Sequence, residues 1–363
     1  QQGTARPAGA APMTPDLVAG PHAPPPFHPL RRPNAGARPM SRSSLVSLAV
    51  GLLVAASLIA ANDPTAILRT LLQAGWGVAA VVALHLPQIL LSALGWRALI
   101  ADPARPGIAT LAHLRWVRES VNNLLPVARV GGEIVRGRML VRRGVAGVTT
   151  AASLAVDLAV ETATLVVFAL LGLIALALLP NAGGPAAWIA GAATAIGGVA
   201  AIAFMLAQSG GLFRLTDRVM PWLARRTGWQ AAADGGATLH DAVVAIYRRP
   251  HRLRRSGAAH LGSWLVGTLE IWVALQALGI EAGLAEALVI ESLGQVVRSM
   301  GFLVPGALGV QEGGYVLVCG LFGIPPEGAL ALSLVRRLRD LLLGLPGLAA
   351  WRWEAARAGR AAA

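Results

Sequence analysis

Long apolar runs separated by arginine-rich segments dominate the sequence. A helix needs about 20 consecutive apolar residues to cross the hydrocarbon core of a bilayer. Six runs reach about that length, at 44–61, 75–96, 148–179, 186–207, 257–278 and 328–350. Charged residues make up only 13% of the chain, whereas soluble domains carry about 25%. The sequence therefore predicts an all-α, polytopic helical membrane protein and excludes an ordinary soluble domain.

A proline followed seven residues later by a glutamate occurs twice inside this apolar sequence. An offset of 179 residues relates the two copies and also matches a serine and a glycine beside them. The matched pairs are Ser120/Ser299, Pro126/Pro305, Glu133/Glu312 and Gly144/Gly323. Proline breaks a helix, and helix breaks at corresponding positions of two halves are typical of transporters built from internal repeats. The pattern predicts a duplicated, transporter-like unit.

The arginines predict how the spans are oriented, because cytoplasmic loops of membrane proteins are enriched in basic residues. Segment 97–147 contains nine arginines, whereas 279–327 contains only Arg298. This distribution places both termini in the cytoplasm and requires segments 108–145 and 284–324 each to return to its own side. We therefore predict two re-entrant helical hairpins. The units 75–179 and 257–350 would then form an inverted repeat.

The remaining boundaries follow from composition. Residues 1–43 are rich in Pro, Ala and Gly and predict a disordered leader, with Met40 or Met13 as the hypothetical biological start. We predict a transmembrane domain at 44–355, with a cytoplasmic loop at 208–256, and a cytoplasmic tail at 356–363. Within the loop, the apolar and basic residues of 212–226 fit either an interfacial amphipathic helix or a helix packed on the bundle.

Charged side chains within spans cost about 2.5–3.5 kcal/mol each on insertion scales and are usually functional. Asp157 and Glu161 are four residues apart and so lie on one face of the third span. The matching helix carries Arg336, Arg337 and Asp340, and a one-residue shift aligns Asp157 with Arg337. Two interpretations remain open: a buried salt bridge that joins the halves, or a network that lines a cavity for a polar head group and changes partners during transport.

The hairpins supply the other candidates. Glu133 and Glu312 follow glycine-rich breaks, where a carboxylate either caps a helix or belongs to a substrate site between half-helices. Polar residues on the first hairpin arms predict a hydrated groove, with hydrogen bonding between helices as the alternative. The candidate substrate-binding residues are Arg118, Asn122, Asn123, Glu133, Asp157, Glu161, Arg298, Gln311, Glu312, Arg336, Arg337 and Asp340.

Three single polar residues within spans receive lower priority, because a lone histidine is more often packed and satisfied than a ligand. They are His85, Gln88 and Glu270. Trp76 and Trp96 bracket the second span and are separated by 20 residues, which corresponds to about 30 Å of helix. We predict that both are anchors at the membrane interfaces.

Several classes of function are not expected. The sequence contains none of the common metalloprotease, hydrolase, nucleotide-binding or dinucleotide-binding motifs. Cys319 is the only cysteine and the seven histidines lack metal-ligand spacing, so we expect no metal site, no cofactor and no enzymatic activity. The net charge of +13 comes from arginines that follow the positive-inside pattern, so we expect no binding of nucleic acid.

Three segments carry a resemblance to a known family: 118–133, 305–314 and 331–344. They resemble hopanoid-biosynthesis-associated membrane proteins of the HpnL type, within the superfamily that shares the flippase-like transmembrane region of lysylphosphatidylglycerol synthases. The resemblance covers roughly residues 44–355. It implies a bacterial inner-membrane protein that moves a lipid, either a hopanoid or a related polar lipid. Because the chain ends at Ala363 without an aminoacyltransferase domain, lipid aminoacylation is not expected.

Two alternatives to a hopanoid transporter remain from the sequence. One is a phospholipid flippase. The other is a non-transporting scaffold that organises enzymes of lipid biosynthesis. A pocket with a charged lining that opens toward the bilayer would favour transport, and a closed bundle with fully paired charges would favour the scaffold.

Overall fold

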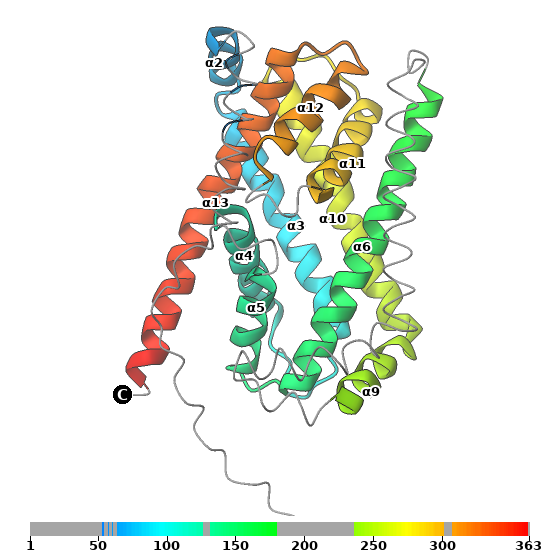
Figure 1. Cartoon of the computed structure of the whole chain (residues 1–363), viewed down its shortest axis with the longest axis vertical. Coiled ribbons are helices and arrows are strands. Elements are labelled where there is room, and N and C mark those ends of the chain that lie inside the picture. The colour runs from blue at the N-terminus through cyan, green and yellow to red at the C-terminus, as the bar shows by residue number, and fades with distance from the viewer. Residues whose placement is uncertain are drawn as a thin grey trace, which may run out of the picture. The chain divides into compact units, whose positions relative to one another are not determined.

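The computed structural model describes residues 64–125, 131–179, 236–300 and 307–361, with Leu53, Ser57 and Ala60 as isolated positions. The chain divides into two units, Gln1–Pro39 and Met40–Ala363, and the described residues all belong to the second unit. Every regular element in these ranges is helical (Figure 1). The predicted all-α class is therefore confirmed for the part of the chain that the structure describes.

The helices follow one another as α2 (Pro64–Gln73), α3 (Gly77–Leu99), α4 (Ile108–Leu124), α5 (Gly131–Val141), α6 (Gly147–Leu178), α9 (Gly236–Tyr247), α10 (Pro250–Ala277), α11 (Leu284–Met300), α12 (Val310–Gly320) and α13 (Pro326–Ala361). Within the described ranges, α3, α6 and α10 are long and apolar enough to cross a membrane. They coincide with three of the predicted spans.

The other three predicted spans have different outcomes. Segment 328–350 lies within α13, which runs through most of the predicted tail to Ala361. Its four charged residues near the middle keep it outside the apolar class of α3, α6 and α10. Segment 186–207 lies outside the described residues, and so does nearly all of 44–61. The count of six spans, the leader and the domain boundaries stay predictions.

The offset of 179 residues recurs in the boundaries of the helices. Helix α5 begins at Gly131 and α12 at Val310, and each has 11 residues. Helix α6 begins at Gly147 and α13 at Pro326, while α4 and α11 each have 17 residues. The turns before α6 and α13 also match, because Gly144 and Gly323 have φ angles of 91° and 71°. The segments that break the two helix pairs, 126–130 and 301–306, lie outside the described residues.

The two sets of helices run in opposite directions. Helices α3 and α10 are antiparallel, with Gly77 beside Ala277 near one end and the Ser92 and Ser263 hydroxyls 3.1 Å apart further along. Figure 1 shows α6 and α13 also running in opposite directions. Helix α6 packs on α11, and α13 packs on α4, so each long helix covers the first hairpin arm of the other set. The orientation of this arrangement in a membrane stays a prediction.

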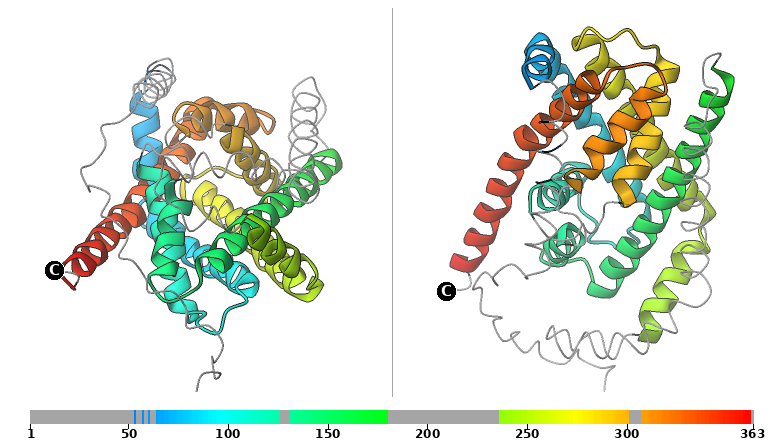
Figure 2. Two further views of the ribbon diagram at one scale, coloured as in Figure 1. Left: turned by 60° about the horizontal axis from the view of Figure 1, so that its bottom comes forward. Right: turned by 45° about the horizontal axis from the view of Figure 1, so that its top comes forward.

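Small residues bring these helices close together. A Cβ atom added to Gly172 of α6 would lie 1.8 Å from the Ser292 hydroxyl of α11, and one added to Gly347 of α13 would lie 2.1 Å from the Ser120 hydroxyl of α4. Such close approach is typical of helix packing in membranes, where tight van der Waals contact replaces the hydrophobic effect. Figure 2 shows these helices from two further directions.

The prediction that Trp96 is an interfacial anchor is wrong. Trp76 is 91% exposed, but Trp96 is fully buried and its indole Nε1 donates to the Ser153 hydroxyl at 3.2 Å. The spacing of the two tryptophans along α3 does not determine which face each occupies, and Trp96 lies on the face that packs into a core with Leu111 and Leu114. Apolarity alone cannot separate a lipid-facing tryptophan from one in the core.

Helix α9 belongs to the segment predicted as a cytoplasmic loop. It packs on α6 and α10, and its Val243 and Ile246 are buried beside Leu99, Ala152 and Val156. The interfacial helix predicted at 212–226 lies outside the described residues.

Candidate functional site: a pocket above a buried ion-pair network

A pocket of about 490 Å³ lies among α3, α4, α6, α10, α11 and α13. Its walls differ in chemistry. On α6, Leu154, Leu158 and Leu165 form an apolar side, and Leu158 is 38% exposed. On α3, α4 and α13 the lining is charged and polar, and this side continues into a network of ion pairs. The pocket therefore offers one apolar wall and one ionic wall.

One part of the network joins α4, α5 and α6. Arg115 and Arg118, one helical turn apart on α4, both hold Glu161 of α6, with Nη2 to carboxylate oxygen distances of 2.8 and 3.0 Å. Arg118 also donates to Glu133 of α5, and Arg115 to Glu119 on its own helix at 3.0 Å. The two arginines thus connect both arms of the first hairpin to α6.

Asp157 lies deeper, below the pocket lining. It accepts from Arg136 Nη2 at 2.8 Å, and its second oxygen lies 2.9 Å from His260 Nε2 of α10. The side chains of Asp157 and Arg136 are both fully buried, and the guanidinium of Arg136 lies 4.5 Å from the centre of the Trp96 ring. Because nothing here faces water, Asp157 is a structural counter-charge for Arg136 rather than a group that a substrate can reach.

A second part of the network joins α10, α11 and α13. Arg336 donates to both oxygens of Glu291 and, at 2.7 Å, to the Tyr315 hydroxyl. Arg339 pairs with Glu270 and with Asp340, the latter at 2.6 Å. Arg298 of α11 reaches the same Asp340 at 3.2 Å.

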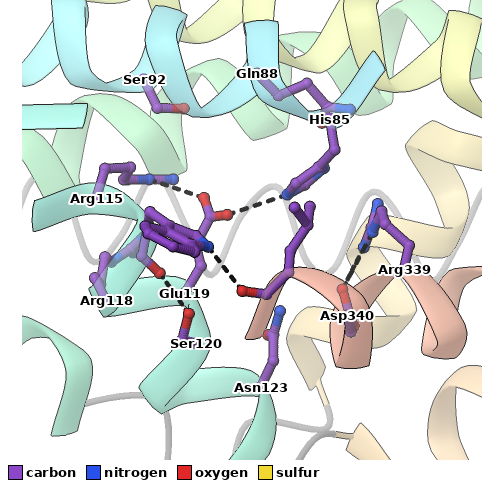
Figure 3. A network of polar contacts seen from close by, with 12 residues as sticks. His85, Gln88, Ser92, Arg115, Arg118, Glu119, Ser120, Asn123, Arg339 and Asp340 are labelled. Atoms are coloured by element: carbon purple, nitrogen blue, oxygen red, sulfur yellow. Dashed lines mark hydrogen bonds and ion pairs between the residues drawn. The ribbon is translucent and has the colours of Figure 1, made fainter. Parts of the chain in front are cut away.

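His85 connects the two parts. Its Nε2 lies 3.1 Å from Glu119 of α4, and its Nδ1 lies 3.2 Å from Glu270 of α10 (Figure 3). Gln88, almost one turn further along α3, also donates to Glu270. The connected network then contains six arginines, which are Arg115, Arg118, Arg136, Arg298, Arg336 and Arg339, and seven carboxylates, which are Glu119, Glu133, Asp157, Glu161, Glu270, Glu291 and Asp340.

Equivalent positions in the two sets of helices make equivalent contacts with different chemistry. At the offset of 179 residues, the Arg136–Asp157 pair corresponds to Tyr315–Arg336, and both pairs are in hydrogen-bond contact. The boundaries of α6 and α13 keep the same offset. The one-residue shift suggested by sequence is therefore not supported, and Asp157 corresponds to Arg336 rather than to Arg337.

The predicted salt bridge between the α6 carboxylates and the α13 arginines is wrong for the described residues. Asp157 and Glu161 pair with arginines of α4 and α5, and Arg336 and Arg337 pair with glutamates of α10, α11 and α12. The reason is spatial, because each long helix packs against hairpin arms that supply nearer partners than the opposite long helix does.

The structure separates the predicted site residues into three groups. Those that line the pocket are Arg118, Asn122, Asn123, Glu133, Glu161, Arg298 and Arg336. Asp157 and Asp340 lie one ion pair behind the lining. Gln311, Glu312 and Arg337 lie outside the lining. The groove predicted between the two breaks thus has a described counterpart only on the Glu133 side.

Glu312 and Glu133 differ although their positions match. Glu312 accepts from the backbone N–H of Gly309 at 2.7 Å and from Arg337 Nε at 3.1 Å, so it caps α12. At the start of α5 that role belongs to Asn122, whose Oδ1 accepts from the N–H of Gly132 at 2.8 Å. Glu133 is consequently free to pair with the α4 arginine at the pocket.

Sequence analysis left out six charged members of the network and gave two of them low priority. Its candidate set lacked His85, Arg115, Glu119, Glu270, Glu291 and Arg339. One available signal was that charged residues inside apolar helices are seldom left unpaired. His85 and Glu270 were ranked low because each stands alone in its span, and only the packing of α3 against α10 brings them together.

Comparison with known proteins agrees with this architecture. No functionally curated protein and no solved structure matches the chain. Residues 44–347, which cover most of the sequence, match the family described as the lysylphosphatidylglycerol synthase TM region. On that match, together with the apolar helices α3, α6 and α10, the chain belongs to this family of membrane domains.

Proposed function

We propose that this protein moves a lipid between membrane leaflets and that the pocket receives the lipid head group. The observation that carries the proposal is the two-sided pocket, in which leucines of α6 face an ionic wall built from α3, α4 and α13. An amphiphilic molecule needs both kinds of surface at once. The family, whose described members are membrane domains of a lipid-modifying synthase, supports a role in lipid handling.

Arg298 is the residue of the ionic wall best suited to bind a head group. It is buried, yet its Nε has no hydrogen-bond partner, and its Nη2 makes only 3.2 Å contacts to Asn123 and Asp340. Asp340 already receives two bonds from Arg339. A buried guanidinium with unused donors favours a phosphate or carboxylate, which accepts bidentate hydrogen bonds.

The test is lipid movement in proteoliposomes, followed with a labelled phospholipid and a labelled hopanoid. The Arg298→Gln variant should slow movement of an anionic lipid about tenfold or more, because a hydrogen bond to a charged group contributes about 1.5–3 kcal/mol. The control is Arg138→Gln, which removes an exposed arginine of α5 outside the pocket. Equal rates in the two variants would contradict the role of Arg298.

The two lipids separate the finer possibilities. Movement of the hopanoid but not the phospholipid would support the HpnL-type assignment, and the amide groups of Asn122, Asn123 and Gln295 in the lining suit a polyol. Movement of the phospholipid alone would support a phospholipid flippase. If folded protein moves neither lipid, the scaffold for lipid-biosynthesis enzymes becomes the better explanation, and the extensive pairing of the buried charges favours that alternative.

The proposed topology is an inverted repeat in the bacterial inner membrane with both termini in the cytoplasm. Its support is the common offset of helix boundaries, the antiparallel α3 and α10, and the exchange of partners by α6 and α13. Accessibility of single cysteines introduced at Arg138 and at Glu327 tests it. These positions should be labelled from opposite sides of the membrane, and labelling from one side would contradict the proposal.

A further inference from the structure

The bridge of Glu119, His85 and Glu270 requires a proton that is absent from the ordinary charge states of these groups. Each ring nitrogen of His85 lies 3.1–3.2 Å from a carboxylate oxygen. A neutral imidazole has one N–H and therefore donates to only one carboxylate. The second contact would then place a nitrogen lone pair against a negatively charged oxygen. Two protons, shared among the three groups, make both contacts attractive.

The charge of the whole network leads independently to the same number. Its six arginines and seven carboxylates leave one negative charge in excess when His85 and His260 are neutral. Glu270 and Asp157 are fully buried, and an uncompensated buried charge is strongly unfavourable. One additional proton makes the described network neutral, and the bridge is where hydrogen bonding needs it.

We propose that His85, Glu119 and Glu270 form a proton-binding site and that the bound proton holds α4 against α3 and α10. The charged groups that face the site are Arg115 and Glu119 on α4, Glu270 on α10, and Arg336 and Arg339 on α13. On α3 itself, the neutral Gln88 donates to Glu270. The proton reaches the site through the pocket, because His85 and Glu119 both belong to its lining.

The site lies where movement of the pocket wall would be felt. Helix α4 provides Arg115, Arg118 and Glu119 to the ionic wall, while α3 and α10 provide its neighbouring residues. Loss of the proton replaces an attraction between α4 and α3 by a repulsion and loosens this wall. Resting on the proposed function, we expect that proton release speeds entry of the head group, so lipid movement should become faster as the pH rises.

Glu119→Gln is the decisive variant because its amide reproduces the protonated state. The Glu119 oxygen Oε1 accepts from Arg115, and Oε2 faces His85. A glutamine at this position accepts from Arg115 with its oxygen and donates to His85 with its nitrogen, and the network becomes neutral without an extra proton. Glu354→Gln is the matched control, since Glu354 also lies between a histidine and an arginine, His113 and Arg143, outside the network.

The first measurement is thermal unfolding of the purified full chain in detergent between about pH 6 and about pH 9, where a free histidine in the unfolded chain loses its proton. The folded wild type keeps a proton that the unfolded chain releases, so its Tm should fall as the pH rises. The Glu354→Gln control should fall in the same way, and Glu119→Gln should lose this decline. Parallel profiles for wild type and Glu119→Gln would overturn the proposal. If Glu119→Gln does not fold, His85→Gln replaces it, with the same loss of the decline expected.

The second measurement is lipid movement in proteoliposomes over the same pH range. The wild type should accelerate with pH, whereas Glu119→Gln should keep the slow rate of the protonated state. Equal acceleration in both would overturn control of the pocket by the proton. Absence of lipid movement in the wild type at every pH would contradict the proposed function and leave the unfolding result, and with it the proton site, intact.

Discussion

Asp157→Ala is expected to destabilise the protein by about 3–5 kcal/mol, because removing one partner of a buried ion pair leaves an uncompensated charge. Arg136 loses its 2.8 Å contact to Asp157 while remaining fully buried, and its Nη1 already has no partner. His260 loses its only ionic contact as well. The measurement is thermal unfolding of the purified protein, with the yield of folded protein as a second readout.

Two further variants show whether the buried charge is responsible. Asp241→Ala removes an exposed carboxylate of α9 and should change stability by less than about 0.5 kcal/mol. Adding Arg136→Met to Asp157→Ala should recover part of the lost stability, since the guanidinium is no longer present. If Asp157→Ala unfolds at the same temperature as Asp241→Ala, Asp157 is not a structural counter-charge.

Gly132→Ala is expected to disrupt the first hairpin and to abolish lipid movement. A Cβ atom at this position would lie 2.4 Å from the Arg118 carbonyl oxygen and 2.6 Å from Asn122 Oδ1. The Arg118 carbonyl belongs to the backbone of α4, so α4 and α5 would have to separate. Such overpacking costs about 1–3 kcal/mol and would also displace Arg118 from Glu133 and Glu161. Thermal unfolding and the proteoliposome assay measure the two effects.

The second hairpin provides the control. Gly313 occupies the first turn of α12, and a Cβ atom there would meet nothing within 4 Å. Gly313→Ala should be neutral or stabilising by up to about 1 kcal/mol, because alanine has the higher helix propensity. Equal effects of the two substitutions would show that the close approach of α4 and α5 does not determine the stability of the first hairpin.

Much of the architecture could be predicted because it depends on local properties. Apolar length identified α3, α6 and α10, and the repeated proline and glutamate identified two interrupted helix pairs whose boundaries recur at the predicted offset. Glycines with positive φ at 144 and 323 occupy matching turns because few other residues adopt that conformation. These features depend on hydropathy and backbone sterics within a few residues.

The candidate site was predicted less completely because it depends on packing. The one-letter pattern placed carboxylates on one long helix and arginines on the other, and it suggested that they pair. In the structure the partners come from hairpin arms, and equal positions diverge: Glu133 lines the pocket whereas Glu312 caps its own helix. A capping asparagine ten residues upstream of Gly132 makes the difference, and no periodicity reveals it.

The sequence by itself determined the membrane class, the helical content of its apolar runs and the twofold recurrence of the broken segments, since each follows from composition and backbone restrictions within a short stretch. Only the tertiary structure decided which charges meet. His85 and Glu270 are separated by 185 residues, and His260 and Asp157 by 103. Their pairing follows from the antiparallel packing of α3 and α10 and the position of α6 beside them. A buried charge takes the nearest partner in space, and nearness in space is a property of the assembled helices.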